Sequence, residues 1–186
     1  MAIETRISNE AYERLALSES DRKWELWDGV LREKPGMSAA HNEVGMMLGH
    51  MLMSQVDRKA YRVRVDSGKV RRPGASYFIP DVFVVPTAFV TPLLERNILE
   101  VYDQPLPLIV EIWSPTTGDY DIEEKLAVYQ QRGDLEIWRI HPYERTLTAW
   151  RRQPDGSYEE STHRESVIWP VALPGVEIDL AVLFDL

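Results

Sequence analysis

The sequence contains no cysteine and only four histidines among its 186 residues. The absence of cysteine excludes disulfides, thiolate zinc sites and cysteine nucleophiles. No two histidines stand at the spacing of metal ligands, so a zinc site is not predicted either. Any metal that the protein binds is therefore expected to have oxygen ligands.

Long hydrophobic runs are missing as well. No stretch of the chain approaches the roughly 18 consecutive apolar residues of a membrane span. The first residues lack the basic and then apolar stretches of a signal peptide. We therefore expect a soluble globular protein that is cytoplasmic and has no membrane partner.

Basic charge is scarce, because 21 Lys and Arg stand against 30 Asp and Glu, which gives a formal net charge of −9. This balance disfavours a simple nucleic-acid-binding protein, since neutralisation of phosphates by Lys and Arg dominates such affinities. It is compatible with an enzyme that has a local basic strip. The candidates for such a strip, which fit a solvated strand face equally well, are Arg58, Lys59, Arg62, Arg64, Lys69, Arg71 and Arg72.

The length fits one domain with one hydrophobic core, and no repeat, low-complexity tract or linker divides the chain. We therefore predict a single domain over residues 1–186. Helices are predicted from Asn9 to Leu17, after the N-cap Ser38, and before Gly133.

Strands are predicted between these helices. Asp28-Gly29 is the strongest hairpin signal in the chain, and residues 61–72 predict a strand with one solvated face that turns at Ser67-Gly68. Three further strands and a terminal strand or short helix follow Gly133. Five tryptophans fall in strand-like segments, where packing in the core is the commoner outcome: Trp24, Trp27, Trp138, Trp150 and Trp169.

Two acidic residues stand at the ends of apolar runs. Asp81 opens the run that follows Pro80, and Glu111 closes LPLIVE. Such runs are typical of buried strands, where a carboxylate is costly unless a positive charge shares the site. A divalent metal between Asp81 and Glu111, with the carbonyl of Ile112 as a third oxygen ligand, would explain both acids. The alternative is a strand end at which one or both acids meet water or an arginine.

Other groups with useful chemistry lie in the neighbouring segments. Glu25 is on the first strand of the predicted hairpin, and His41 is on the inward face of a helix start, where the helix dipole disfavours the imidazolium. Lys125 and Tyr129 lie four residues apart on one helix face. Two carboxylates, a metal and a lysine are the groups that a phosphodiesterase needs.

These residues carry a resemblance to a known family. In chain order the matching motifs are WELWDGVL with Glu25, SAAH with His41, IPDVFVV with Asp81, LIVEIWSPTTGDYDIEEKLAVYQQRG with Glu111, LEIWRIHP, and LPGVEIDL. They resemble the bacterial Uma-two family of restriction-endonuclease-like proteins, within the PD-(D/E)XK phosphodiesterase superfamily. The resemblance spans nearly the whole chain.

The resemblance implies an α/β (α+β mixed) fold with a restriction-endonuclease-like core, in which a central mixed β-sheet is flanked by helices and carries extra antiparallel strands. It implies Asp81 and Glu111 as metal ligands for Mg²⁺ or Mn²⁺. It also implies Glu25 as an accessory acid and His41 as a pocket residue.

The chain departs from the superfamily pattern at one position. The usual lysine lies two residues after the glutamate, where this chain has Trp113. Lys125 resembles the known solution in which this lysine has moved to the adjacent helix. The alternative for Lys125 is a surface lysine paired with Asp121, worth only about 0.3–0.5 kcal/mol.

Three functional interpretations follow. The first is a metal-dependent endonuclease that acts on DNA as a homodimer, with Asp81, Glu111, Lys125, Glu25 and His41 as its catalytic residues. The second is an inactive nuclease-like module for binding or regulation, which the net charge and Trp113 favour. The third is a hydrolase of a small phosphodiester, because an acidic protein need not bind a long polyanion.

Overall fold

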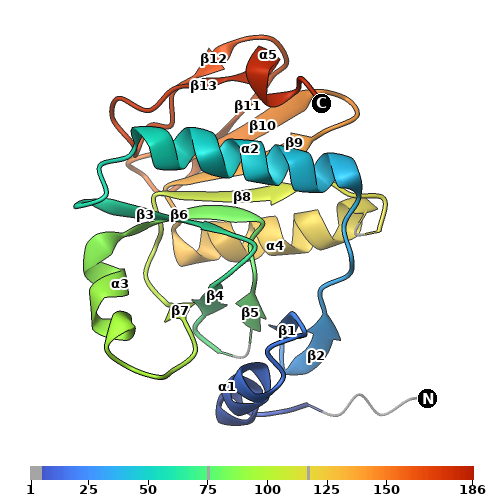
Figure 1. Cartoon of the computed structure of the whole chain (residues 1–186), viewed down its shortest axis with the longest axis vertical. Coiled ribbons are helices and arrows are strands. Elements are labelled where there is room, and N and C mark those ends of the chain that lie inside the picture. The colour runs from blue at the N-terminus through green and yellow to red at the C-terminus, as the bar shows by residue number, and fades with distance from the viewer. Residues whose placement is uncertain (1–5, 75, 117) are drawn as a thin grey trace.

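Two large β-sheets, a two-stranded sheet and five helices make up the described part of the chain (Figure 1). The computed structural model describes residues 6–74, 76–116 and 118–186, without the side chains of 118–122. No helix among these residues has the length and apolar character needed to span a membrane.

The larger sheet has the strand order β11-β10-β9-β8-β6-β3. It is mixed, because β8 and β9 pair in parallel and the other neighbours pair antiparallel. The strands are β3 (Tyr61–Val65), β6 (Val82–Pro86), β8 (Leu108–Ile112), β9 (Glu136–His141), β10 (Thr146–Arg152) and β11 (Tyr158–His163).

Helices cover both faces of this sheet. On one face α2 (Ala39–Gln55) and α5 (Leu180–Leu183) share a core with Val82, Val110 and Trp138. On the other face α4 (Gly118–Arg132) packs Val128 and Tyr129 against Ile109 and Ile137. The predicted mixed sheet with flanking helices is confirmed.

The smaller sheet has the order β2-β1-β5-β4-β7 and packs against α1 (Asn9–Ser18) through Tyr12, Leu26 and Tyr77. It supplies the extra strands that the fold prediction included. Its strands are β1 (Trp24–Trp27), β2 (Val30–Glu33), β4 (Lys69–Arg72), β5 (Ser76–Phe78) and β7 (Val101–Tyr102). The remaining elements are α3 (Thr87–Leu94), β12 (Val167–Ile168) and β13 (Ile178–Asp179).

Local sequence signals explain where these elements begin. Ser8 and Ser38 cap α1 and α2, each accepting a hydrogen bond from a backbone N–H of the first turn. Asp28 and Gly29 both have positive φ, at 46° and 87°, as a tight two-residue hairpin turn requires. The predicted hairpin and both predicted helix starts are confirmed.

The segment around Ser67-Gly68 differs from a simple strand and turn. The strands on its two sides, β3 and β4, belong to different sheets, so the turn joins the two layers. Three candidates for a basic strip are paired with acids, Arg64 with Glu100, Arg71 with Asp103 and Arg72 with Asp28. These ion pairs favour the solvated-face interpretation of that cluster.

One tryptophan departs from the expected core packing. Trp138 is fully buried and Trp27 nearly so, whereas the side chain of Trp169 is 60% exposed. Trp169 follows the two-residue strand β12 and precedes Pro170, where the chain has already left the sheet. The core prediction was therefore wrong for Trp169.

Helix α2 lies unusually close to the sheet. A Cβ atom added at Gly49 would stand 2.5 Å from Cγ2 of Val65, whereas one at Gly45 would make an ordinary contact of 3.5 Å with Ile112. Glycine within a helix costs about 1 kcal/mol relative to alanine, so the close approach explains its presence at position 49. This approach holds the first turn of α2, with His41, over Asp81.

Candidate active site

Asp81 lies at the junction of the two sheets, directly before β6, and is 3% exposed. Its Oδ1 accepts a hydrogen bond from Nζ of Lys34 at 2.7 Å, and its Oδ2 accepts one from the backbone N–H of Ile112 at 2.6 Å. Burial alone would raise the pKa of this carboxyl, but the charge of Lys34 and the neighbouring His41 hold the pKa well below its usual range. Asp81 is therefore an ionised, buried carboxylate.

Lys34 is a residue of the site that the sequence did not reveal. Its ammonium donates to the carbonyl of Ile79 at 2.9 Å and to Asp66 at 3.0 Å, in addition to Asp81. Burial lowers the pKa of Lys34, but Asp81, Glu111 and other nearby acids raise it by more than burial lowers it. The net shift of the pKa is therefore upward. No motif marked this lysine, because it stands alone after β2 and meets Asp81 only through the fold.

Glu111 lies in β8 and points toward α4. The hydroxyl of Tyr129 donates to its Oε1, and Nζ of Lys125 lies 3.5 Å from the same oxygen. Burial, with Asp81 and Glu25 nearby, raises the pKa of Glu111 to about 7 even though the two lysines lower it. The segments of Asp81 and Glu111 lie side by side, as a metal shared by the two acids would require, since β6 and β8 are antiparallel neighbours.

Lys125 is buried at 6% exposure and bonds to Oε1 of Glu25 at 3.0 Å. A surface lysine paired with Asp121 is thereby ruled out, although the side chain of Asp121 itself lies outside the described residues. Burial lowers the pKa of Lys125, but Glu111 and Glu25 raise it above its ordinary value. Lys125 is therefore a fixed positive charge, better suited to neutralising or orienting a group than to removing a proton.

Glu25 connects the smaller sheet to the site. Its Oε1 also accepts the backbone N–H of Ile79 at 2.8 Å, and its Oε2 accepts Nε1 of Trp27 at 3.2 Å. The carboxylate is 4% exposed. Because these contacts fix Glu25, it acts as the support that holds Lys125 beside Glu111.

His41 is buried in the first turn of α2, and its Nε2 lies 3.1 Å from Oδ2 of Asp81. That nitrogen makes no hydrogen bond among the described residues. Its Nδ1 lies 3.3 Å from Oδ1 of Asn42. Nε2 therefore faces the negative charge of Asp81 without a well-formed hydrogen bond to it.

Three acids and two lysines are thus collected in one buried cluster: Asp81, Glu111 and Glu25 with Lys34 and Lys125. In the described part of the chain no three His, Asp or Glu side chains are arranged to hold a metal ion. Magnesium sites commonly use one or two carboxylates and fill the other positions with water or substrate oxygens. The carbonyl of Ile112 as a third ligand stays a prediction.

Two cavities open beside this cluster. One, of about 290 Å³, is lined by His41, Asn42 and Asp81 among others. The second, of about 330 Å³, borders Lys34, Asn42 and Asp66. Because Asn42 and Asp66 line both, the two cavities are neighbours, and Lys34 lines one of them and Asp81 the other.

Comparison with known proteins identifies the fold and the family. No curated protein matches the chain. A solved structure described as "a putative nuclease belonging to DUF820 from Anabaena variabilis" has a similar fold, with a TM-score of 0.75 and 19% sequence identity over 93% of this chain and 96% of that one. The model of the Uma2 family, described as "Putative restriction endonuclease", matches residues 9–182. Since this match includes the whole buried cluster, the protein belongs to the Uma2 family, as its motifs predicted.

Proposed function

We propose that the protein is a Mg²⁺- or Mn²⁺-dependent endonuclease that hydrolyses phosphodiester bonds in DNA. The observation that carries this proposal is the buried cluster, in which Asp81 and Glu111 from neighbouring strands meet Lys125 from α4. A purely structural role would not require three buried carboxylates and two buried ammonium groups, of which Asp81 and Lys34 line open cavities. Membership of a family described as restriction endonucleases supports the same reaction.

The residues of the cluster fit a hard divalent metal. Carboxylate oxygens of Asp81 and Glu111 and the carbonyl of Ile112 would hold it. Nε2 of His41, which makes no hydrogen bond among the described residues, lies 3.1 Å from Asp81, and a bound cation would fit beside these two groups. Bound there, the ion would polarise the phosphate and acidify a water molecule.

The protein's own side chains would position the substrate, the attacking water and the metal ligands. Lys125, held by Glu25, would neutralise charge that develops on the phosphate and orient the attacking water. Tyr129 fixes the orientation of Glu111, and Lys34 fixes that of Asp81. With its pKa raised to about 7, Glu111 holds a proton over much of the acidic range, which metal binding would release.

A specific observation favours the inactive binding module as the second candidate. The ammonium of Lys34 already neutralises Asp81, and Trp113 stands where the superfamily has its lysine. In such a module the two lysines would replace the metal and the cluster would be a structural ion network.

Cleavage assays separate the two candidates. Supercoiled plasmid, single-stranded DNA and RNA would be incubated with the protein in Mg²⁺, Mn²⁺ or EDTA, beside Asp81→Asn, Lys125→Met and the control Arg14→Gln on the exposed face of α1. We expect metal-dependent cutting of DNA by the wild type and by Arg14→Gln, and a reduction of about a hundredfold or more in Asp81→Asn and Lys125→Met. A folded protein that cuts nothing in any metal would favour the binding module, and cutting only of short nucleotides would favour the small phosphodiester.

We also propose a homodimer, because cutting both strands of a duplex requires two active sites. Sedimentation equilibrium across a range of protein concentrations measures the mass directly. A mass that stays at the 21.5 kDa of one chain at every concentration would contradict this part of the proposal.

A further inference from the structure

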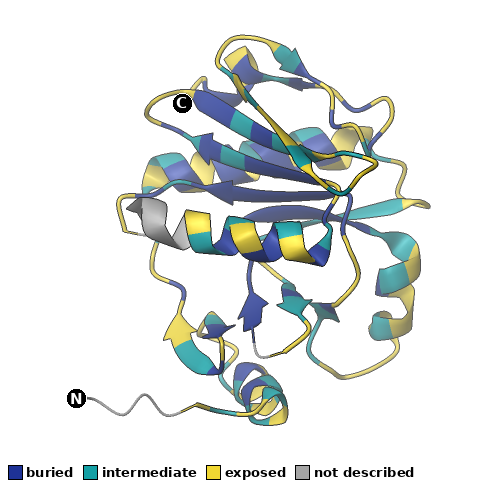
Figure 2. Cartoon of the chain, turned by 180° about the vertical axis from the view of Figure 1, so that it is seen from behind, coloured by how far each residue is buried: buried dark blue, intermediate teal, exposed yellow. Residues whose placement is uncertain are grey.

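The face of the larger sheet that carries Glu111 extends well beyond α4. Glu111 pairs in register with Arg139 of β9, Arg139 with Thr148 of β10, and Thr148 with Thr162 of β11. Paired residues of adjacent strands present their side chains on the same face. Viewed from this side, α4 crosses one part of the sheet and the outer strands carry no helix (Figure 2).

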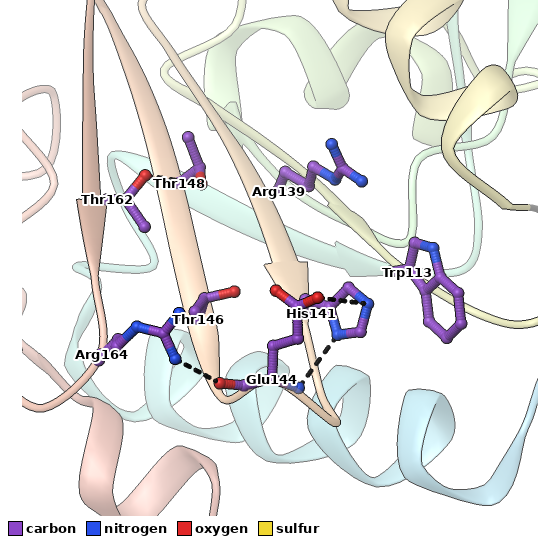
Figure 3. A pocket seen from close by; sticks show the side chains of 8 residues that line it. All are labelled: Trp113, Arg139, His141, Glu144, Thr146, Thr148, Thr162 and Arg164. Carbon is purple, nitrogen blue, oxygen red and sulfur yellow. Dashed lines mark hydrogen bonds and ion pairs between the residues drawn. The ribbon is translucent and has the colours of Figure 1, made fainter.

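A cavity of about 420 Å³ lies on this uncovered face (Figure 3). We call it the outer cavity. It is formed mainly by Trp113, Arg139, His141, Thr148, Thr162 and Arg164. Its volume falls within the range of small-ligand sites, about 300–1,000 Å³. Because Arg139 is the register partner of Glu111, the outer cavity begins one strand away from the buried cluster.

An aromatic group forms one side of the outer cavity. The rings of Trp113 and His141 stack with centroids 4.3 Å apart and planes inclined by 20°, and Tyr143 meets Trp113 edge-on at 5.8 Å. The N–H of Glu144 donates to Nδ1 of His141, which fixes the orientation of the imidazole ring. Trp113 is therefore held rigidly where the superfamily usually has a lysine.

The opposite side of the outer cavity carries two arginines. Arg139 and Arg164 both line it, and among the described lining residues the carboxylate is that of Glu144, which lies 3.8 Å from His141. Arg164 is exposed and donates to the carbonyl of Glu144 at 3.3 Å, so its charge is not cancelled by that contact. On a chain of net charge −9, the exposed guanidinium of Arg164 in this lining favours a phosphate-bearing ligand.

We propose that the outer cavity binds a single-stranded segment of the nucleic-acid substrate next to the bond that is cut. One base would pack against Trp113, and its phosphate would lie against Arg164. Stacking on a ring requires a base that has left the duplex, so the substrate is a single strand or a duplex that is opened at this nucleotide. This inference rests on the proposed nuclease function and adds to it a substrate class and a binding surface.

The experiment measures binding without cleavage. Fluorescence anisotropy of a labelled oligothymidylate of about ten nucleotides would be followed in EDTA, for the wild type and for Arg164→Gln, Trp113→Phe and Trp113→Ala. The control Arg14→Gln removes the same charge from the exposed face of α1, far from the outer cavity. A duplex of the same sequence serves as competitor.

We expect Arg164→Gln to weaken binding about tenfold at low salt and to lower the slope of log affinity against log salt by about 0.7. Trp113→Ala should weaken binding roughly five- to a hundredfold, and Trp113→Phe should retain most of the affinity. The duplex should compete poorly and Arg14→Gln should bind as the wild type does.

Two results would overturn the inference. One is unchanged binding in Arg164→Gln and in both Trp113 variants, and the other is an equal loss in Arg14→Gln, which would indicate a general effect of charge. Because no metal is present, the result is independent of catalysis. If the protein cuts DNA but its affinity is unchanged by the substitutions in the outer cavity, this inference alone is refuted. If the substitutions weaken binding but the protein cuts nothing, the proposed function alone is refuted.

Discussion

Lys34 and Asp81 form a buried pair in which each charge depends on the other. The two side chains are each 3% exposed, and no other lysine in the described part of the chain contacts Asp81 directly. Removing one partner of such a pair leaves an uncompensated charge in a medium that solvates it poorly. The pair is therefore expected to contribute strongly to folding, whatever its part in catalysis.

We predict that Lys34→Met lowers the free energy of unfolding by about 3–5 kcal/mol, as measured by urea denaturation. The exposed control Lys59→Met should change it by less than about 0.5 kcal/mol. In a double-mutant cycle, Asp81→Asn should recover part of the loss, because the neutral amide no longer needs the ammonium. Equal stabilities of Lys34→Met and Lys59→Met would show that the pair contributes nothing.

Glu111 gives the metal-free protein a distinctive dependence on pH. Its pKa is about 7 in the folded state against an ordinary value of 4.5, so between these values the folded protein keeps a proton that the unfolded chain has released. The resulting stabilisation is fully present at low pH and is lost as the pH rises through about 7. The pKa of Asp81 is lowered, so its contribution to stability is lost as the pH falls, and this loss occurs only at more acidic pH.

Urea denaturation in EDTA between about pH 5 and pH 7.5 tests this dependence. We expect the wild type to lose more stability over this range than Glu111→Gln, whose amide does not titrate, by an amount of a few kcal/mol. Glu123→Gln, on the exposed side of the same helix as Lys125, is the matched control and should follow the wild type. Parallel curves for wild type and Glu111→Gln would contradict the raised pKa.

At the scale of elements, the contact between α2 and β3 decides how the first turn of α2 meets Asp81. Two glycines of the same helix offer a direct comparison, because a methyl group at Gly49 would overlap Val65 and one at Gly45 would not. Both positions lie in helix interior, so the intrinsic gain of alanine over glycine is the same for each.

We predict that Gly49→Ala destabilises the protein by about 1–3 kcal/mol, whereas Gly45→Ala is neutral or stabilises it by up to about 1 kcal/mol. Thermal unfolding followed by circular dichroism measures both. Moving α2 away from the sheet should also displace His41, so Gly49→Ala should cut DNA more slowly than Gly45→Ala. Similar unfolding temperatures for the two variants would show that α2 is free to shift.

At the scale of the whole molecule, Arg132 links the two sheets. Its side chain is fully buried at the end of α4, pairs with Asp134, and donates to the carbonyls of Arg71, Tyr102 and Gln104. Arg71 and Tyr102 belong to the smaller sheet, whereas Asp134 lies two residues before β9 of the larger one. The planar guanidinium can reach all of these acceptors at once, which a lysine cannot.

Arg132→Lys should therefore destabilise the protein by about 2–3 kcal/mol, since at least one buried acceptor loses its charged donor. Arg152→Lys, at an exposed position in β10, is the matched control and should stay within about 0.5 kcal/mol of the wild type. Hydrogen exchange should show earlier opening of the smaller sheet in Arg132→Lys. Unchanged exchange there would mean that the sheets are held together by other contacts.

Much of this architecture follows from local signals in the chain. Serine caps, the Asp28-Gly29 turn and apolar periodicity act between residues close in sequence, so they determined the helices, the first hairpin and the buried strands that carry Asp81 and Glu111. The motif order also determined the family. These features depend on backbone preferences and on which residues avoid water, both of which a linear sequence expresses directly.

Only the tertiary structure decided the partners of the buried charges. Lys34 contacts Asp81 across 47 positions and Lys125 contacts Glu25 across 100. These contacts depend on the packing of the two sheets and produce no periodic pattern in the sequence. The same packing, through the pairing of β8 with β9, placed Trp113 beside His141 and Glu111 beside Arg139. A chain's residue types thus indicate which chemistry is available, but the desolvation and distance that set each charge's partner and pKa arise only when distant segments meet.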